Sequence, residues 1–158
     1  PCLIKYIGYS PFNFKYKLNP IIITEHAKNF NLIDFLKNEH IILEHKLIII
    51  YGIASGMSYL HLHNIIHPDL KPSNILIGQD EIIKIGDFGL SKITNSVSIN
   101  HSISGTKGTP AYLSPEIIKD QEYTSAGDVY AFGILVYEIM TAKRAFSDLS
   151  IYHFLPPF

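Results

Sequence analysis

The chain has 158 residues, 47% of them hydrophobic, which is enough for one domain with a buried core and too few for two. Its formal net charge of -1 offers no argument for a nucleic-acid partner or an anionic membrane surface, and we expect neither. The single cysteine, Cys2, excludes an internal disulfide. Together with the lack of a recognisable signal peptide or lipidation motif, it favours the cytoplasm.

Apolar stretches near the start of the chain predict two short strands, over residues 3–9 and 21–24. The segment between them, SPFNFKYKLNP, has a proline near each end and is predicted to be a turn-rich connection. Asn31 then precedes a short apolar run, LIDFL. We expect Asn31 to cap a short helix whose first turn holds Asp34.

A longer helix is predicted over residues 44–63. Its apolar positions recur at spacings of three and four, which predicts one buried face made of Leu47, Ile50, Ala54, Met57 and Leu60. Residues 47–66 carry no Asp, Glu, Lys or Arg over about the length of a membrane span, so a membrane helix is an alternative. Polar residues such as His61 and His63 interrupt this stretch, and a buried core helix is therefore favoured.

The second half of the chain alternates between turns and apolar runs. The segments NILI and EIIKIG predict a hairpin with its turn at residues 78–81. Residues 91–107 are rich in Ser, Thr and Asn and have little apolar periodicity, so we expect an exposed loop. Ser114 is placed to cap a short helix over residues 115–119, and residues 125–141 predict a strongly apolar helix.

Five polar features occur in a fixed order along this pattern. Asp69 and Asn74 lie five residues apart, Asp87 opens the tripeptide DFG, GTPAYLSPE follows, and Asp128 begins the apolar helix. Each feature alone is more often an ordinary turn or helix start. Their joint order resembles the catalytic half of a eukaryotic protein kinase. DLKPSN and GTPAYLSPE resemble the serine/threonine type, and YGIASGMSYLH with DVYAFGILVYEIMT is closest to the tyrosine-kinase-like branch.

This resemblance implies an α+β, protein-kinase-like fold that is only partly present. Residues 1–24 would be the end of the small lobe, residues 25–31 the hinge, and residues 32–158 a truncated large lobe. The whole chain would then be one partial protein kinase domain.

On the adenine side of the implied nucleotide site, four residues match the family pattern: Thr24, Glu25, Ala27 and Leu76. Thr24 resembles the gatekeeper residue. The backbone C=O of Glu25 and the backbone N–H of Ala27 would meet adenine, and Leu76 would form the floor under the purine.

On the phosphate side, the resemblance assigns Asp69 to the acceptor hydroxyl, where phosphoryl transfer needs a carboxylate. The reaction also needs hard oxygen ligands for Mg²⁺, and Asn74 and Asp87 would supply them from neighbouring loops. Lys71 would offset charge beside the migrating phosphate, and Thr109 would bridge Asp69 and Lys71. The implied cofactors are ATP and Mg²⁺, and the implied partner is a protein substrate.

Histidines near this loop admit two interpretations. By resemblance, His67 stacks on Phe88, while Gly89 lets the DFG segment reorient. A metal site made of His61, His63 and His67 is the alternative. Their spacing matches no zinc pattern and no cysteine accompanies them, so we do not expect metal binding there.

Pro68 stands where many kinases carry an arginine that docks a phosphorylated residue of the activation loop. Proline has neither a charge nor a backbone N–H, so we expect a protein that does not depend on such docking. The predicted exposed loop holds several hydroxyls that are candidate phosphorylation sites or ordinary polar residues: Ser96, Ser98, Ser102, Ser104 and Thr106.

The chain begins at Pro1, and it contains no glycine-rich phosphate loop, no strand lysine and no arginine to pair with Glu116. We therefore expect a piece of a longer kinase, inactive by itself, whose parent transfers the γ-phosphoryl group of ATP to serine or threonine hydroxyls of protein substrates. The alternative is a pseudokinase or a truncated, non-catalytic protein-interaction module.

Overall fold

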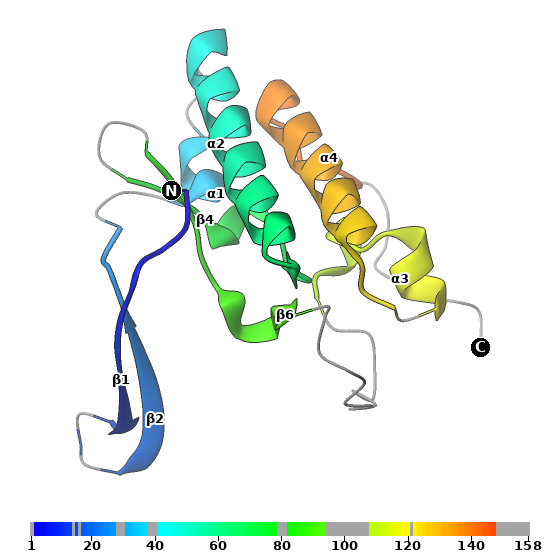
Figure 1. The fold of residues 1–158 in the computed structure, drawn as a ribbon. Coiled ribbons are helices and arrows are strands. Elements are labelled where there is room, and N and C mark those ends of the chain that lie inside the picture. The colour runs from blue at the N-terminus through cyan, green and yellow to red at the C-terminus, as the bar shows by residue number, and fades with distance from the viewer. Residues whose placement is uncertain are drawn as a thin grey trace.

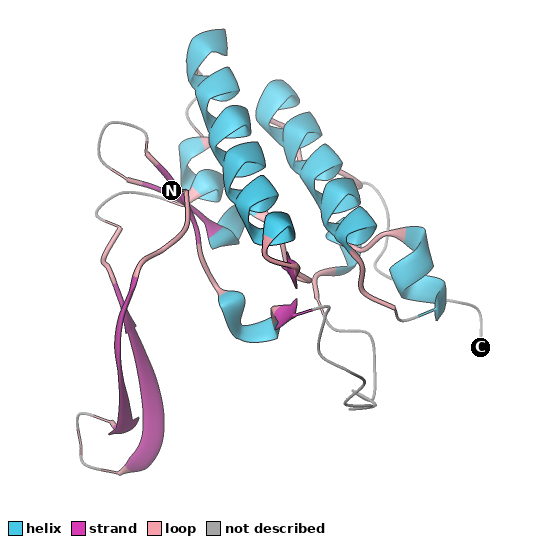
Figure 2. Cartoon of the chain, viewed as in Figure 1, coloured by secondary structure: helices cyan, strands magenta, loops and turns pink. Residues whose placement is uncertain are grey.

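The structure is a computed structural model that describes residues 2–13, 15, 17–27, 31–37, 41–78, 82–93, 108–120 and 122–147. Two long helices, α2 (Leu43–Leu62) and α4 (Ser125–Thr141), run side by side, and a strand hairpin extends away from them (Figure 1). Three two-stranded antiparallel sheets complete the described fold (Figure 2). The expected α+β architecture is confirmed.

The N-terminal hairpin is longer than the sequence predicts. Strand β1 (Tyr6–Phe12) pairs antiparallel with β2 (Leu18–Thr24), so both strands extend into the segment expected to be a connection, and the first strand begins later than residue 3. A tight turn makes this possible, because the side-chain oxygen of Asn13 accepts from the backbone N–H groups of Lys15 at 2.9 Å and Lys17 at 3.0 Å. The two prolines in the strands are tolerated because the sheet has only two strands.

The first helices follow the prediction in position. Helix α1 (Leu32–Phe35) begins after Asn31, whose side chain accepts from the backbone N–H of Asp34 at 3.0 Å, so the predicted cap is confirmed. Helix α2 begins and ends within one residue of the predicted bounds. Among the described residues, no helix is long and apolar enough to cross a membrane.

The buried face of α2 differs from the predicted one. Met57 and Leu60 are buried as expected, Ile50 packs partly buried against the core, and Ala54 is partly buried. Leu47, however, is 52% exposed, and the fully buried contacts of this part of the helix come from Ile49 and Ile53. The helix is apolar around most of its circumference, so spacing alone does not select the buried face. Close approach of a strand selects it, because α2 packs on β5 (Ile83–Ile85) along a face that carries Gly52 and Gly56.

Short strands frame the loops that follow α2. Strand β4 (Ile75–Ile77) pairs with β5 as the predicted hairpin, although residues 79–81 of its turn lie outside the described residues. Strand β3 (Ile65–Ile66) pairs with β6 (Lys92–Ile93), so the segment expected to be a loop from residue 91 begins with a strand. Cross-strand backbone pairing forms β6 there without apolar periodicity. The rest of that predicted loop, with its five candidate hydroxyls, lies outside the described residues.

The C-terminal helices are confirmed. Helix α3 (Pro115–Asp120) follows Ser114, whose hydroxyl oxygen accepts from the N–H of Ile117 at 3.4 Å. Helix α4 has the predicted bounds and is capped by Thr124. The core between α2, β4, β5 and α4 is built from apolar side chains with no exposed surface, including Leu32, Ile49, Ile53, Ile75, Ile85, Leu135 and Ile139.

The close contact of α2 with β5 predicts opposite effects for two glycine substitutions. A Cβ at Gly52 would lie 2.7 Å from Cγ1 and 2.9 Å from Cβ of Ile83, whereas a Cβ at Gly133 of α4 would meet nothing within 4 Å. We expect Gly52→Ala to lower the free energy of unfolding by about 1–3 kcal/mol. Gly133→Ala should raise it by up to about 1 kcal/mol, since alanine is the better helix former. Urea unfolding of both variants measures this, and equal effects would contradict the packing described.

Candidate active site

A short loop between β3 and β4 carries the polar residues of the candidate site. It ends in the 3-10 turn η1 (Pro72–Asn74), which leads directly into β4. Asp69 and Asn74 are both buried, with 8% and 7% of their surface exposed. Buried polar groups need partners, so the hydrogen bonds of this loop determine its shape.

Asp69, Lys71 and Thr109 form a closed triangle of contacts. The Lys71 ammonium nitrogen lies 2.6 Å from Oδ2 of Asp69 and donates to Oγ1 of Thr109 at 3.0 Å. The Thr109 hydroxyl donates in turn to Oδ1 of Asp69 at 3.0 Å. All three contacts are only partly exposed to solvent, and the sequence singled out all three residues. The triangle holds the Asp69 carboxylate in one orientation.

Asn74 is fixed against the same carboxylate. Its amide nitrogen donates to the backbone oxygen of Asp69 at 2.8 Å and lies 3.3 Å from its Oδ2. A backbone carbonyl only accepts, so these contacts assign the NH₂ group to that side of Asn74. The amide oxygen then accepts from the hydroxyl of Ser73 at 3.3 Å and retains capacity for a second partner.

Asp87 reaches the site from the next loop. The N–H of Gly86 donates to the backbone oxygen of Asn74 at 2.8 Å, which brings the residue before Asp87 against η1. Asp87 itself is exposed and has a left-handed backbone with φ 58°. This conformation is unfavourable for a residue other than glycine and is frequent at functional sites. One carboxylate oxygen accepts from the N–H of Gly89 at 3.4 Å.

The donor set fits a magnesium ion. Asn74 supplies an amide oxygen and Asp87 a carboxylate, both hard oxygen donors from adjoining loops. Mg²⁺ often takes only one or two protein ligands and completes its shell with water and phosphate oxygens. Among the described residues, no three His, Cys, Asp or Glu side chains lie close enough together to hold a metal ion.

Two of the residues predicted on the adenine side meet at the β4–β5 hairpin, since Leu76 lies in β4 and Glu25 contacts Lys84 of β5. The Glu25 carboxylate accepts from the backbone N–H of Lys5 at 2.7 Å and from the Lys84 ammonium at 3.0 Å. The Lys84 and Lys5 contacts lower the pKa of Glu25. Lys84 stands opposite Leu76 in the hairpin, so the contact brings the segment after Thr24 to the face that Leu76 occupies. Ala27, the fourth predicted residue, is exposed to an intermediate degree.

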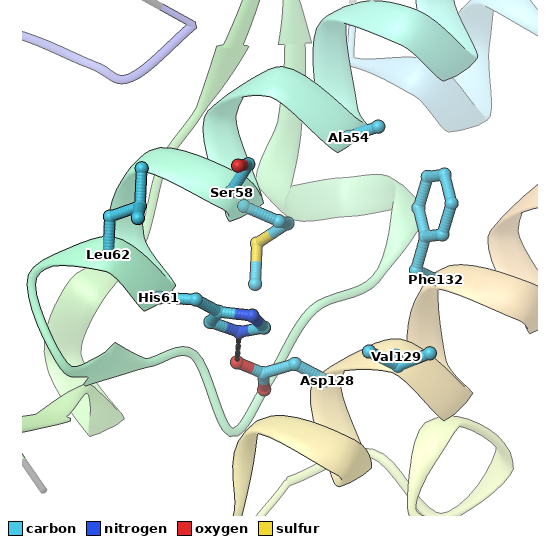
Figure 3. Close-up of a pocket in the computed structure, with 8 residues that line it drawn as sticks. Ala54, Ser58, His61, Leu62, Asp128, Val129 and Phe132 are labelled. Atoms are coloured by element: carbon cyan, nitrogen blue, oxygen red, sulfur yellow. Dashed lines mark hydrogen bonds and ion pairs between the residues drawn. The ribbon is translucent and has the colours of Figure 1, made fainter.

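The buried carboxylate of Asp128 binds the backbone of the loop that carries Asp69. Oδ2 of Asp128 on α4 accepts from the backbone N–H of His67 at 2.9 Å and from Nε2 of His61 on α2 at 2.8 Å. Both side chains line a pocket of about 410 Å³ between the two helices. Figure 3 shows the His61 ring directed at the Asp128 carboxylate. From the sequence, Asp128 was predicted to be one of the five functional features, whereas the only site proposed for His61 was a metal site. The two residues lie 67 positions apart in the chain, so no local sequence pattern predicts their contact.

His67 then links this support to Asp87. Its Nε2 donates to the backbone oxygen of Gly86 at 3.0 Å. Its ring contacts Phe88 at 5.3 Å between centroids with 63° between the planes, so the expected contact exists with an edge-to-face geometry. The His67 side chain therefore holds the loop before Asp87 against the loop before Asp69.

Gly108 has a role that the sequence did not assign. Its φ of 114° is a conformation that side chains strain, and a Cβ there would lie 2.9 Å from the backbone oxygen of Pro68. Pro68 is itself buried. Glycine at 108 thus lets the segment carrying Thr109 approach the loop closely enough to contact Asp69.

Tyr112 and the buried carboxylate of Glu138 form a second, partly buried contact, which was not predicted from the sequence. The Tyr112 hydroxyl lies 2.9 Å and 3.1 Å from the two carboxylate oxygens of Glu138, and the N–H of Ala145 donates to Oε1 at 2.9 Å. Burial, and then the Glu138 charge, raise the pKa of Tyr112 well above its ordinary value. A glutamate inside an otherwise apolar helix was the available signal, because such a charge needs a partner. This contact ties the 3-10 turn η4 (Pro110–Tyr112) to α4.

Comparison with known proteins identifies this arrangement. The family model for the protein kinase domain matches residues 4–153. The chain belongs to the protein kinase family. The predicted resemblance to serine/threonine kinases, including the tyrosine-kinase-like character, is confirmed by the named relatives.

Three relatives illustrate the match to this kinase segment. The chain is 38% identical over 136 residues to the "Putative serine/threonine-protein kinase/receptor" of Acanthamoeba polyphaga mimivirus, covering 84% of the chain and 8% of the viral protein. It is 36% identical over 148 residues to RGS domain-containing serine/threonine-protein kinase A of Dictyostelium discoideum, covering 92% of the chain and 12% of that protein. It is 42% identical over 98 residues to mitogen-activated protein kinase kinase kinase 12 of Rattus norvegicus, covering 62% of the chain and 11% of the rat protein. The chain therefore spans only about a tenth of these relatives.

The buried support predicts a graded response to substitution at Asp128. Asp128→Ala removes the acceptor for the His67 N–H and should lower the free energy of unfolding by about 1–3 kcal/mol. Asp128→Asn keeps one carbonyl oxygen at this place, so it should lower the free energy of unfolding less than Asp128→Ala does. Hydrogen exchange of the His67 amide tests the contact directly, because its protection should fall most in Asp128→Ala.

The exposed acid Asp34 provides the control, since Asp34→Ala removes only a surface ion pair with Lys37. Equal protection of the His67 amide in Asp128→Ala and Asp34→Ala would contradict the role assigned to Asp128.

Proposed function

We propose that these residues are the phosphotransfer site of an ATP- and Mg²⁺-dependent protein serine/threonine kinase. The observation that carries the proposal is the triangle of Asp69, Lys71 and Thr109 beside the oxygen donors of Asn74 and Asp87. The kinase family of the chain and the serine/threonine kinase names of its relatives support it. The assignment covers the full protein of which this chain is a segment.

In this proposal the chain contributes the catalytic part of a larger domain. Residues 1–24 are the end of the small lobe, residues 25–31 the hinge and residues 32–158 a truncated large lobe. The backbone of Glu25 and Ala27 binds adenine, next to the gatekeeper Thr24, and Leu76 lies under the purine.

Asp69 receives the substrate hydroxyl and takes its proton as the hydroxyl oxygen attacks the γ-phosphorus of ATP. The bond from the γ-phosphorus to the bridging oxygen breaks at the same time, and ADP leaves with that oxygen. Lys71 and Thr109 keep the carboxylate pointed at that hydroxyl, and the Lys71 ammonium offsets the charge of the migrating phosphoryl group. Asn74 and Asp87 would hold Mg²⁺, which when bound neutralises phosphate oxygens. The rigid contacts among these side chains matter because the reaction depends on positioning.

Substitution at Asp69 tests catalysis. In the full-length protein, Asp69→Asn should lower kcat by about 10²-fold to 10⁴-fold with little change in the KM for ATP, since the base is lost while nucleotide binding remains. Thr109→Ala should lower kcat by about 10-fold to 100-fold through loss of a charged hydrogen bond, and Thr109→Ser is the matched control that retains the hydroxyl. Transfer of radiolabelled phosphate to a protein substrate provides the measurement.

Substitution at Asp87 tests the metal assignment separately. Asp87→Asn should abolish the magnesium dependence of ATP binding measured by calorimetry. Wild-type protein that binds ATP with Mg²⁺ yet transfers no phosphate would favour the non-catalytic interaction module instead. Activity unaffected by Asp69→Asn would refute the proposed mechanism.

Pro68 supports a proposal about regulation. The residue is buried beside Gly108 and offers no cation to a phosphate, while Asp69, Lys71 and Asn74 keep their contacts around it. Proline therefore removes the phosphate clamp and leaves the chemistry of the loop intact.

This predicts activity that is independent of activation-loop phosphate. Simultaneous alanine substitution of the five loop hydroxyls should change kcat/KM less than about twofold, because no clamp is lost. The substituted residues are Ser96, Ser98, Ser102, Ser104 and Thr106. A collapse of kcat/KM that glutamate substitutions restore would overturn this prediction.

A further inference from the structure

A second pocket, of about 520 Å³, adjoins the candidate active site. Its apolar wall comes from α1 and η1, which pack against each other. Its opposite wall is the segment that follows α4. Three cationic side chains line it among the described residues: Lys37, Lys143 and Arg144.

The pocket shares its walls with the segments that hold Asp69. Pro72 lines the pocket and directly follows Lys71, whose ammonium contacts the Asp69 carboxylate at 2.6 Å. Glu138 also lines it, and the hydroxyl of Tyr112, three residues after Thr109, binds this glutamate. A polypeptide whose hydroxyl reaches Asp69 would therefore have its flanking residues next to this pocket.

The charges in this pocket are predominantly positive. Lys143 and Arg144 are exposed, and neither forms a salt bridge with a carboxylate that the structure describes. Lys37 is partly neutralised by Asp34 at 2.6 Å. The one acidic residue in the lining, Glu138, is only 2% exposed, and its oxygens accept from Tyr112 and Ala145. The pocket therefore has a local excess of positive charge, although the chain as a whole has a net charge of -1.

A fixed turn holds the two cations at the pocket. Ala142 ends α4 in a left-handed conformation with φ 53°, and its N–H donates to the backbone oxygen of Glu138 at 2.8 Å. The N–H of Lys143 donates to the Thr141 hydroxyl oxygen at 3.2 Å, and the N–H of Ala145 donates to the Glu138 carboxylate. The backbone on both sides of Arg144 is thereby anchored.

We propose that this pocket binds an acidic segment of the protein substrate, next to the hydroxyl presented to Asp69. The inference rests on the proposed function and deepens it, because it names the substrate class that this site takes. Charge complementarity supplies the recognition: carboxylates in the substrate pair with Lys143 and Arg144 over the apolar wall of Ile33, Leu36 and Pro72. Such pairing between partly exposed groups weakens as salt increases.

The test uses the full-length protein and three peptides that share one acceptor serine and carry glutamate, alanine or lysine in the flanking positions. We expect kcat/KM for the glutamate peptide to exceed that for the alanine peptide by about 2-fold to 30-fold, the range for two exposed ion pairs. In the variant Lys143→Glu/Arg144→Glu, the order of the glutamate and lysine peptides should reverse, while KM for ATP and kcat/KM for the alanine peptide stay within about twofold.

The matched control is Lys15→Glu/Lys17→Glu, which makes the same change in net charge at the exposed β1–β2 turn. It should leave the order of the peptides unchanged. The neutralising variant Lys143→Gln/Arg144→Gln serves if the charge reversal prevents folding, and it should abolish the glutamate preference. Fluorescence anisotropy of the labelled glutamate peptide adds a binding readout that needs no catalysis.

The outcomes separate this inference from the proposed function. Phosphate transfer without a glutamate preference, or with a preference that both substitutions at residues 143 and 144 leave intact, overturns the acidic-substrate inference alone. Binding of the glutamate peptide that depends on Lys143 and Arg144, with no phosphate transfer to any peptide, overturns the proposed catalysis and supports the pocket. Absence of both transfer and binding overturns both proposals.

Discussion

The rest of the site depends on the hydrogen bonds that the Asp128 carboxylate accepts. Asp128 is 4% exposed and accepts from the His67 backbone and the His61 ring, so one anion joins α2, α4 and the loop that carries Asp69. His67 then reaches the backbone oxygen of Gly86 and thereby positions Asp87. An anion at this depth is stable only while its donors remain in place, so the helices and both loops are held in one arrangement.

Each buried carboxylate among the described residues has such a set of donors. The Asp69 carboxylate is contacted by the donor groups of Lys71, Thr109 and Asn74. The Glu138 carboxylate accepts from the Tyr112 hydroxyl and the N–H of Ala145. The three acids thus connect α2, α4, η1 and the segment from Gly108 to Tyr112 around one site. Apolar packing of α2 on β5 brings these segments near, and the polar contacts select their orientation.

The site was more predictable than the surfaces that carry it. The resemblance carried by the order of Asp69, Asn74, Asp87 and Thr109 sufficed to anticipate that Thr109 bridges Asp69 and Lys71, because the chemistry restricts which residue types can serve there. The contact of Asn74 with Asp69 was not anticipated. The buried face of α2 was not predictable from spacing, since the helix is apolar nearly all round and Gly52 and Gly56 reveal their function only against β5. The length of the β1–β2 hairpin depended on a turn that the Asn13 side chain closes.

By itself, the sequence determined the family, the order of the helices and of the β4–β5 hairpin, and the residues available for chemistry, because motifs and helix caps are local patterns that a chain carries with it. Only the tertiary structure decided that His61 supports Asp128, that Gly108 admits Thr109 to the loop, and that Tyr112 binds Glu138. It also gathered Lys37, Lys143 and Arg144 around one pocket, although Lys37 lies more than 100 positions from the other two. Contacts between residues so far apart form only when burial of the intervening core brings them together, and no local pattern encodes them.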